Sequence, residues 1–225
     1  MGESKEAKYI PRINSDLRRH VLEMPETVWK ASGILIWGRR IKSLIFTTDV
    51  AIIRNCNADA VLAVYPFTPQ QVIMQSVISA SYIPVFCGVG GGTTQGPRAA
   101  ILAKDAEARG AIGVVVNNPM PNTSLAMIKS AVDIPIVVTI FSADEDIEAR
   151  LEAGASILNV SAAERTPEVV RAIREKFPTL PIIATGGPTA QTVLETIQAG
   201  ANAISYTPPS TKQLFSQMME DYRGR

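Results

Sequence analysis

Eight short apolar runs recur along the chain, separated by longer segments whose apolar residues follow helical spacing. The runs are rich in valine and isoleucine and show no polar alternation, as expected of parallel strands buried on both faces. We therefore predict eight strands that alternate with eight helices. The strands are expected at residues 43–47, 60–64, 84–88, 112–116, 135–139, 156–160, 181–185 and 202–206.

The residues that flank these runs repeat with every second run. The third, fifth and seventh runs begin at a proline, whereas the fourth, sixth and eighth follow a helix that ends at Gly110, Gly154 or Gly200. Glycine at such a position closes a helix in the left-handed conformation. The segments 148–161 and 194–207 also match each other. A βαβα unit repeated in this way predicts an α/β fold, a closed (β/α)8 TIM barrel in one domain, rather than an open doubly wound sheet.

Residues 1–42 precede the first predicted strand and are expected to form an extension packed on the barrel of residues 43–225. A helix is predicted over residues 14–32. The apolar segment 33–38, followed by Arg39 and Arg40, is expected to form a hairpin or a plug that closes the bottom of the barrel. These arginines lie at the end of the barrel opposite the functional face. His20 is the single histidine, and we expect it to have a surface or packing role.

The composition excludes several classes of protein. The 225 residues are 46% hydrophobic and 19% charged with a formal net charge of +1, which argues against disorder and against a nucleic-acid-binding surface. No apolar run approaches the roughly 18 residues that span a bilayer, so no membrane partner is expected. We expect a cytoplasmic protein with two reduced cysteines. A barrel of this size is also expected to form a homo-oligomer, a dimer.

The segment 181–213 predicts a strand, a Gly-Gly turn, an amphipathic helix, a second strand and a capped helix start. Two helix N-termini are thereby expected at one place, where free main-chain N–H groups bind an anion without a basic side chain. The ligand expected there is a small phosphorylated molecule. The predicted phosphate-binding residues are Thr185, Gly186, Gly187, Ser205, Tyr206, Thr207 and Lys212.

The loop after the third predicted strand, residues 88–98, contains five glycines that contribute nothing to a core. Such a loop usually contacts a ligand or moves. In a (β/α)8 barrel the site is built from the carboxyl ends of the strands and the loops that follow them. A solvated surface role is the alternative for the charged residues of this set. The candidate substrate-binding residues are Gly90, Gly91, Gly92, Thr93, Arg98, Thr139 and Arg165.

Four residues at predicted strand ends are candidates for chemistry. Asp49 is a candidate general acid or base, since partial burial raises the pKa of a carboxyl group; capping the next helix is the alternative. Cys87 is a candidate thiolate nucleophile, with a small buried hydrophobic role as the alternative. Asn117 and Asn159 are expected either to bind substrate hydroxyls or an oxyanion, or to satisfy loop backbone groups.

The last two strand–helix units resemble those of the phosphate-binding TIM barrels, the ribulose-phosphate-binding group. The matching residues are Thr185, Gly186 and Gly187 after the seventh strand and Ser205, Tyr206 and Thr207 before the last helix. That group includes enzymes of histidine and tryptophan biosynthesis, hexulose-phosphate and keto-deoxy-phosphogluconate lyases, and FMN-linked relatives. The resemblance implies that these residues bind phosphate, and it specifies no reaction.

The chain departs from that group in its chemistry. Aldolases of the group use a strand lysine as a Schiff base, whereas the sixth predicted strand here carries Asn159. The sugar isomerases of histidine biosynthesis use one acid after strand one and another after strand five, and here Asp49 has no partner because strand five ends in Thr139. With one histidine and no cluster of carboxylates at the strand ends, no metal site is predicted.

Three functions remain open from the sequence. The first is an enzyme that acts on a small phosphorylated metabolite by lyase, isomerase or hydrolase chemistry, with no metal or other cofactor. The second is an FMN-linked or nucleotide-linked oxidoreductase, in which the phosphate of FMN occupies the same site. The third is a non-catalytic sensor that keeps the phosphate site without acid–base residues.

Overall fold

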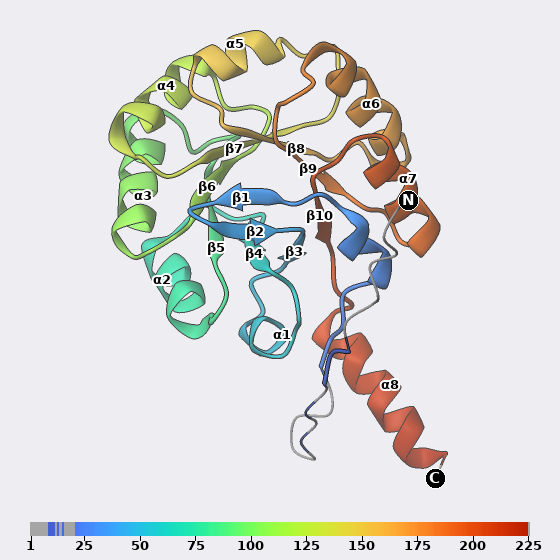
Figure 1. Cartoon of the computed structure of the whole chain (residues 1–225). Helices are drawn as coiled ribbons and strands as arrows, with labels where there is room; N and C mark the ends of the chain where they lie inside the picture. Colours follow the sequence, from blue (N-terminus) through green and yellow to red (C-terminus); the bar gives the residue numbers. More distant parts are fainter. Residues whose placement is uncertain (1–8, 12, 14, 16–20, 225) are drawn as a thin grey trace.

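The computed structural model describes residues 9–11, 13, 15 and 21–224 of the chain. Eight parallel strands close into a barrel in the order β10-β3-β4-β5-β6-β7-β8-β9, with helices around it (Figure 1). The predicted (β/α)8 fold is therefore confirmed. The barrel strands are β3 (Ser43–Phe46), β4 (Ala60–Ala63), β5 (Val85–Gly90), β6 (Gly113–Val116), β7 (Ile136–Ile140), β8 (Ile157–Val160), β9 (Ile182–Thr185) and β10 (Ala203–Tyr206).

The helices alternate with these strands. Gly110, Gly154 and Gly200 follow three of them at φ values of +94°, +115° and +114°, the left-handed closure expected from the sequence. Within the described residues, no helix has both the length and the apolar character needed to cross a membrane. The helices are α1 (Val50–Arg54), α2 (Gln71–Ala80), α3 (Gly96–Ala108), α4 (Asn122–Ala131), α5 (Ile147–Glu152), η3 (Ala163–Arg165), α6 (Thr166–Lys176), α7 (Ala190–Gln198) and α8 (Thr211–Arg223).

Side chains along each barrel strand point alternately into the barrel and toward the helices. Two buried clusters correspond to these two directions. The inner core, which includes Leu44, Phe86 and Val137, fills the barrel, and the outer core, which includes Ile45 and Leu158, lies between the strands and the helices. This alternation decides which strand residues can reach a ligand at the barrel mouth.

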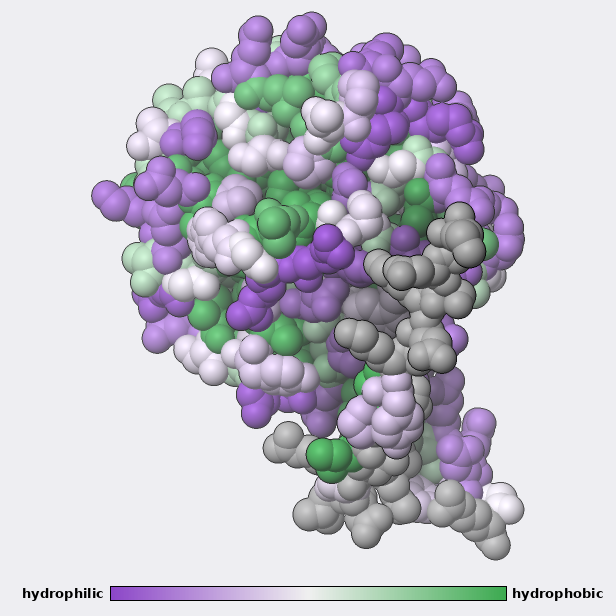
Figure 2. Space-filling model, viewed as in Figure 1, coloured by the Kyte–Doolittle hydropathy of each residue, from purple (hydrophilic) through white to green (hydrophobic). Residues whose placement is uncertain are grey.

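A hairpin closes the N-terminal end of the barrel. Its strands, β1 (Ile34–Ile36) and β2 (Arg39–Ile41), pair antiparallel and lie across the end of the barrel that faces the viewer in Figure 1. Ile34, Ile36 and Ile41 are buried in the inner core. Arg39 and Arg40 are exposed. Figure 2, in the same view, shows hydrophilic residues over the ring of helices and a mixture of apolar and hydrophilic surface around the hairpin.

The helix predicted over residues 14–32 is not formed in the described part of that segment. There the chain has only η2 (Glu26–Lys30), a short 3-10 helix that begins after Pro25. Positions 14 and 16–20, His20 included, lie outside the described residues. A proline at the start fixes φ but adds no N–H donor, and five residues are too few for a stable isolated helix.

Residues 22–30 fill the place where a barrel of this kind packs its eighth helix. Leu22 donates its N–H to the carbonyl oxygen of Asn55 at 2.8 Å, just after α1, while η2 packs against α7. Met24 and Val28 are buried in the outer core. Helix α8, in contrast, has no buried residue and projects away from the barrel (Figure 1). The N-terminal segment thus covers the gap between α7 and α1.

Candidate functional site

A cavity of about 1100 Å³ opens at the carboxyl ends of the barrel strands. Its floor is formed by inward-facing residues, one near the end of each strand. On the side of β3, β4 and β5 these are Phe46, Val64 and Gly88. On the side of β6 to β10 they are all polar, so the floor has an apolar half and a polar half. The polar half consists of Asn117, Thr139, Asn159, Thr185 and Ser205.

The lining of this cavity carries no charged side chain. Among the described residues that form it there is no Asp, Glu, Lys, Arg or His. Tyr65, Phe67 and Phe141 add aromatic surface; at the rim, Phe67 is mostly exposed and Phe141 is half exposed. An ionised ligand group placed in this cavity loses water without gaining an opposite charge from the lining, which is costly. Charged parts of a ligand are therefore expected where solvent or unpaired main-chain N–H groups can reach them.

Asn159 on β8 is the buried polar centre of the floor. Its side-chain Nδ2 donates to the hydroxyl oxygen of Thr139 at 3.1 Å, and the residue is 7% exposed. Its Oδ1 atom has no hydrogen-bond partner among the described residues. Next to it, the hydroxyl of Thr185 lies 3.4 Å from that of Ser161. Because an unpartnered buried carbonyl oxygen costs free energy, Asn159 is the group that a bound ligand would satisfy.

The glycine-rich loop forms one wall of the cavity. Gly91 and Thr94 exchange main-chain hydrogen bonds of 3.0 and 3.2 Å, which makes a tight turn. Gly91 has a φ of +119°, and a Cβ atom there would lie 2.7 Å from the Cβ of Asn117. The predicted substrate-binding residues Gly90, Gly91, Gly92 and Thr93 all line the cavity. Glycine is required at position 91 because the loop passes directly over Asn117.

The Gly186-Gly187 turn connects the polar half of the floor to α7. Thr185 lines the cavity and directly precedes the turn. A Cβ at Gly186 would lie 2.7 and 2.8 Å from methyl groups of Ile204 and Val193, so this glycine lets α7 start close to the barrel. Gly187 adopts a φ of +75°. The turn therefore brings the first turn of α7 beside the polar half, although the two glycines do not themselves line the cavity.

The start of α7 has the free donors that an anion requires. The Thr189 hydroxyl caps the N–H of Thr192 at 3.2 Å, and no described residue accepts a hydrogen bond from the main-chain N–H of Gly187, Ala190 or Gln191. Unpaired N–H groups and the helix dipole favour a negative charge at this place. Ser205 and Thr207, from the neighbouring strand end, line the cavity nearby.

The start of α8, the second helix N-terminus predicted at the anion site, does not join the start of α7 there. Pro208 and Pro209 have no N–H to offer, and the Ser210 N–H is taken by the side chain of Gln213 at 2.8 Å. The Thr211 hydroxyl binds Asp49, which turns the start of α8 toward α1. Lys212 is exposed and does not line the cavity.

Three more candidates lie away from the cavity. The Tyr206 side chain packs against the outer core because it follows the inward-facing Ser205 in the strand alternation. Arg98 lies exposed on α3. Arg165 is exposed and pairs with Glu168 at 3.4 Å. None of these three side chains lines the cavity.

Asp49 is a helix cap. One carboxylate oxygen accepts the N–H groups of Ala51 at 2.8 Å and Ile52 at 3.2 Å, and the other accepts the hydroxyl of Thr211. The bond from Thr211, helped by the two backbone N–H groups, holds the pKa of Asp49 below its usual value of 3.8. The carboxyl group does not line the cavity and its pKa is lowered, which favours the capping role over the acid–base role.

We expect Asp49→Ala to lower the free energy of unfolding by about 1 kcal/mol, the usual cost of losing an N-cap. Because the pKa of Asp49 is lowered on folding, its contribution is present above the ordinary aspartate pKa and is lost as the pH falls through the lower folded value. Urea unfolding between neutral pH and strongly acidic pH measures both effects. Asp49→Asn, which still caps a helix, should be nearly as stable as the wild type at neutral pH; a loss as large as that of Asp49→Ala would contradict a capping role.

Cys87 is placed outside the site by the strand alternation. It lies between the inward-facing Phe86 and Gly88, so its thiol points toward the helices and is fully buried in the outer core. Burial raises the pKa of this thiol to about 12. A thiol with such a pKa is protonated at neutral pH and is a poor nucleophile. The position of Cys87 thus favours its alternative role as a small buried side chain over a catalytic one.

Both cysteines should resist thiol reagents in the native protein. Cys56 is also buried, and burial raises its pKa. With a disulfide-exchange reagent at neutral pH, we expect almost no reaction before unfolding and two thiols per chain after unfolding in guanidinium. Rapid reaction of one thiol in the native protein would show that Cys87 or Cys56 is accessible.

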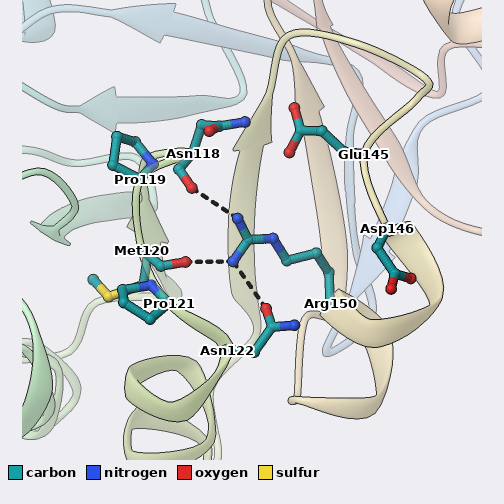
Figure 3. A pocket seen from close by; sticks show the side chains of 8 residues that line it. All are labelled: Asn118, Pro119, Met120, Pro121, Asn122, Glu145, Asp146 and Arg150. Carbon is teal, nitrogen blue, oxygen red and sulfur yellow. Dashed lines mark hydrogen bonds between the residues drawn. The ribbon is translucent and has the colours of Figure 1, made fainter.

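A second, smaller hollow of about 460 Å³ lies beside the loop after β6 (Figure 3). The guanidinium group of Arg150 on α5 donates to the carbonyl oxygens of Asn118, at 2.7 Å, and Met120, and to Oδ1 of Asn122 at 2.9 Å. These bonds attach α5 to the loop that carries Asn117. Arg150 is therefore used to fix this loop, and the hollow lies outside the barrel mouth.

Comparison with known proteins identifies the fold and no closer relationship. No protein-family model matches the chain, and no curated protein sequence matches it. Among solved structures, the chain is similar to a phosphonopyruvate hydrolase in complex with oxalate and Mg++, at 13% identity over 84% of this chain and 83% of that one, with a TM-score of 0.64. A phosphoenolpyruvate phosphomutase from Streptomyces platensis subsp. rosaceus matches at 16% identity, 87% and 83% coverage and a TM-score of 0.64.

A third neighbour is a 2,3-dimethylmalate lyase, described as a PEP mutase/isocitrate lyase superfamily member, at 14% identity, 89% and 85% coverage and a TM-score of 0.62. That superfamily differs from the ribulose-phosphate-binding group that the motif resembles. What the chain shares with these neighbours is the barrel fold.

The expectation of no cofactor, with FMN as the alternative, is contradicted by these neighbours, one of which was solved with Mg++. Mg²⁺ is held in proteins by one or two carboxylates together with waters and ligand oxygens. The described lining residues include no carboxylate, and no group of three or more His, Cys, Asp or Glu side chains gathers in the described part of the chain. The residues of this site therefore do not fit a magnesium ion.

Three aromatic residues that line the cavity were not predicted from the sequence: Phe46, Phe67 and Phe141. Phe46 could have been found from the period of two, because it follows the inward-facing Leu44 on the same strand. The same period of two directs the side chains of Cys87 and Tyr206 away from the cavity. Phe67 and Phe141 lie in loops, where no periodicity applies.

Proposed function

We propose that the carboxyl-terminal face of the barrel is the active site of an enzyme that acts on a small phosphorylated metabolite by lyase, isomerase or hydrolase chemistry. The observation that carries this proposal is the continuity of the polar half of the floor with the Gly186-Gly187 turn and the free N–H groups of α7. In the proposal, the phosphate lies at the start of α7, near Thr185, Ser205 and Thr207.

The rest of the substrate then lies over the polar half of the floor. Thr139 and Asn159 hold its hydrogen-bonding groups, and Asn117 faces it from the next strand. The aromatic rim and the glycine-rich loop exclude water from the bound molecule, which strengthens these hydrogen bonds. The three solved neighbours are all enzymes by their descriptions, and two act on phosphonate or phosphate compounds, which agrees with this ligand class.

A second function is favoured by one specific observation. Because the described lining has no ionised side chain, the cavity offers Tyr65 as its only titratable group apart from the ligand itself. General acid–base catalysis normally requires a positioned titratable group. A sensor that binds the same phosphorylated molecule without changing it is therefore the alternative.

One experiment separates the two functions. The wild type and an Asn159→Leu variant are incubated with a mixture of phosphorylated metabolites, which is analysed by mass spectrometry before and after. An enzyme should consume one species in the wild-type sample only, whereas a sensor should retain one species unchanged on the protein. If the wild type neither binds nor alters any phosphorylated compound, the proposed function is wrong.

The predicted dimer and the predicted cytoplasmic location stay predictions. Oligomeric state can be measured by light scattering coupled to size-exclusion chromatography.

A further inference from the structure

The described lining of the cavity is polar on one side and uncharged throughout. It contains no cation that could pair with a carboxylate and no carboxylate that could hold a metal ion. Burying an unpaired charge costs far more than burying a hydroxyl group that is hydrogen-bonded. A ligand of the oxalate and Mg++ type, as seen in the phosphonopyruvate hydrolase neighbour, therefore meets no side chain of opposite charge in this lining.

Within the described lining of the cavity, the one buried side-chain atom that lacks a partner is an acceptor. Asn159 Oδ1 is unpaired among the described residues, while its Nδ2 is bound to Thr139 at 3.1 Å. A carbonyl oxygen can only be satisfied by a donor, such as the O–H of an alcohol. An ionised carboxylate has no hydrogen to donate, so it would leave Oδ1 unpaired and bring a second acceptor close to it.

The distance between Asn159 and Thr185 sets the length of the ligand that can reach both residues. β8 and β9 are neighbours, and Asn159 pairs with Ile183, so Thr185 lies one strand away and two residues nearer the barrel mouth. From the dimensions of a parallel sheet, the backbones at Asn159 and Thr185 are roughly 8 Å apart. A chain of about three carbons is long enough to connect a phosphate beside Thr185 with a hydroxyl at Asn159.

From these three observations we propose that Asn159, held by Thr139, is a specificity-determining residue that selects an uncharged, hydroxyl-bearing end of the ligand and rejects a carboxylate or a metal chelate. This inference rests on the proposed phosphate site, which fixes the other end of the ligand. The apolar half of the floor, formed by Phe46, Val64 and Gly88, then faces the carbon chain of the ligand.

Two matched probes test this directly. Glycerol 3-phosphate and 3-phosphoglycerate have the same phosphate and the same number of carbons, and differ in one terminal group, an alcohol against a carboxylate. Calorimetric titration with each probe, and with inorganic phosphate alone, should show that the wild type binds glycerol 3-phosphate about tenfold or more tightly than 3-phosphoglycerate.

Two variants identify the residue responsible. Asn159→Leu should lose most of the preference for glycerol 3-phosphate and keep its affinity for inorganic phosphate, and Thr139→Val should weaken the preference less. The melting temperature of each variant without ligand shows that it is folded. If one of them fails to fold, the other and the wild-type preference still decide the result.

The outcomes separate the two proposals. Equal binding of the two probes, or displacement of glycerol 3-phosphate by oxalate with Mg²⁺, would overturn the specificity inference while leaving the phosphate site intact. Failure of all three phosphate compounds to bind would contradict the phosphate site itself, and with it this inference.

Discussion

A Gly186→Val variant is expected to lose at least tenfold in affinity for inorganic phosphate and to unfold with a free energy lower by about 1–3 kcal/mol. The added side chain begins 2.7 Å from the Cγ2 of Ile204 and 2.8 Å from the Cγ2 of Val193. Both partners are buried between the barrel and α7, so they cannot move aside without shifting the helix. The start of α7, with its free N–H groups, is then displaced from the polar half of the floor.

Titration calorimetry with phosphate, together with urea unfolding, measures both effects. Gly113 offers a control for crowding alone, since a Cβ there would meet the ring of Phe86 at 2.6 Å inside the barrel, far along the chain from α7. Gly113→Ala should reduce stability with little change in phosphate affinity. Unchanged phosphate affinity in Gly186→Val would show that the anion site does not depend on the position of α7, and would contradict the proposed geometry.

An Arg174→Met variant is expected to lower the free energy of unfolding by about 3 kcal/mol and the melting temperature by roughly 6–12 °C. The guanidinium group joins the end of α6 to the segments before β9 and β10. It donates to the carbonyl oxygens of Gly200 and Leu180, at 2.7 and 2.8 Å, and to Oδ1 of Asn202 at 2.9 Å. Methionine keeps the length of the side chain but donates no hydrogen bond, so the carbonyl oxygens of Gly200 and Leu180 lose this donor, while Asn202 Oδ1 keeps the N–H of Ile182.

Arg174→Lys is the matched control, because it keeps the charge but cannot donate in several directions from a planar group. Calorimetric melting of the three proteins should give the order wild type, Lys variant, Met variant. Equal melting temperatures of the wild type and Arg174→Met would show that these bonds are replaced by water at no cost.

The fold could be predicted because each signal was local and repeated. Apolar runs, Gly110, Gly154 and Gly200 at helix ends, and prolines before alternate strands all reported on the same unit. The N-terminal segment could not be predicted in this way. Residues 22–30 pack between α1 and α7 through contacts distant in sequence, and no local pattern shows that they displace α8.

The candidate site was predicted in part. Strand ends identified Thr139, Asn159, Thr185 and Ser205 as polar groups at the mouth, since residues there depend only on the fold. Asp49 and Cys87 do not line the cavity, for two different reasons. The capping bond from Thr211 comes from the far end of the chain, whereas the outward direction of Cys87 followed from the strand period.

The most direct test of the phosphate site is native mass spectrometry of gently purified protein equilibrated with inorganic phosphate. Gly187→Asp places a carboxylate at the turn, Gly187→Ala controls for the added Cβ beside Thr192, and Gly110→Asp adds the same charge at an exposed glycine with a similar φ of +94°. We predict a bound phosphate or phosphorylated ligand in the wild type and in Gly110→Asp, and its loss in Gly187→Asp. An unliganded wild type, or equal retention in Gly187→Asp, would contradict a phosphate site at the start of α7.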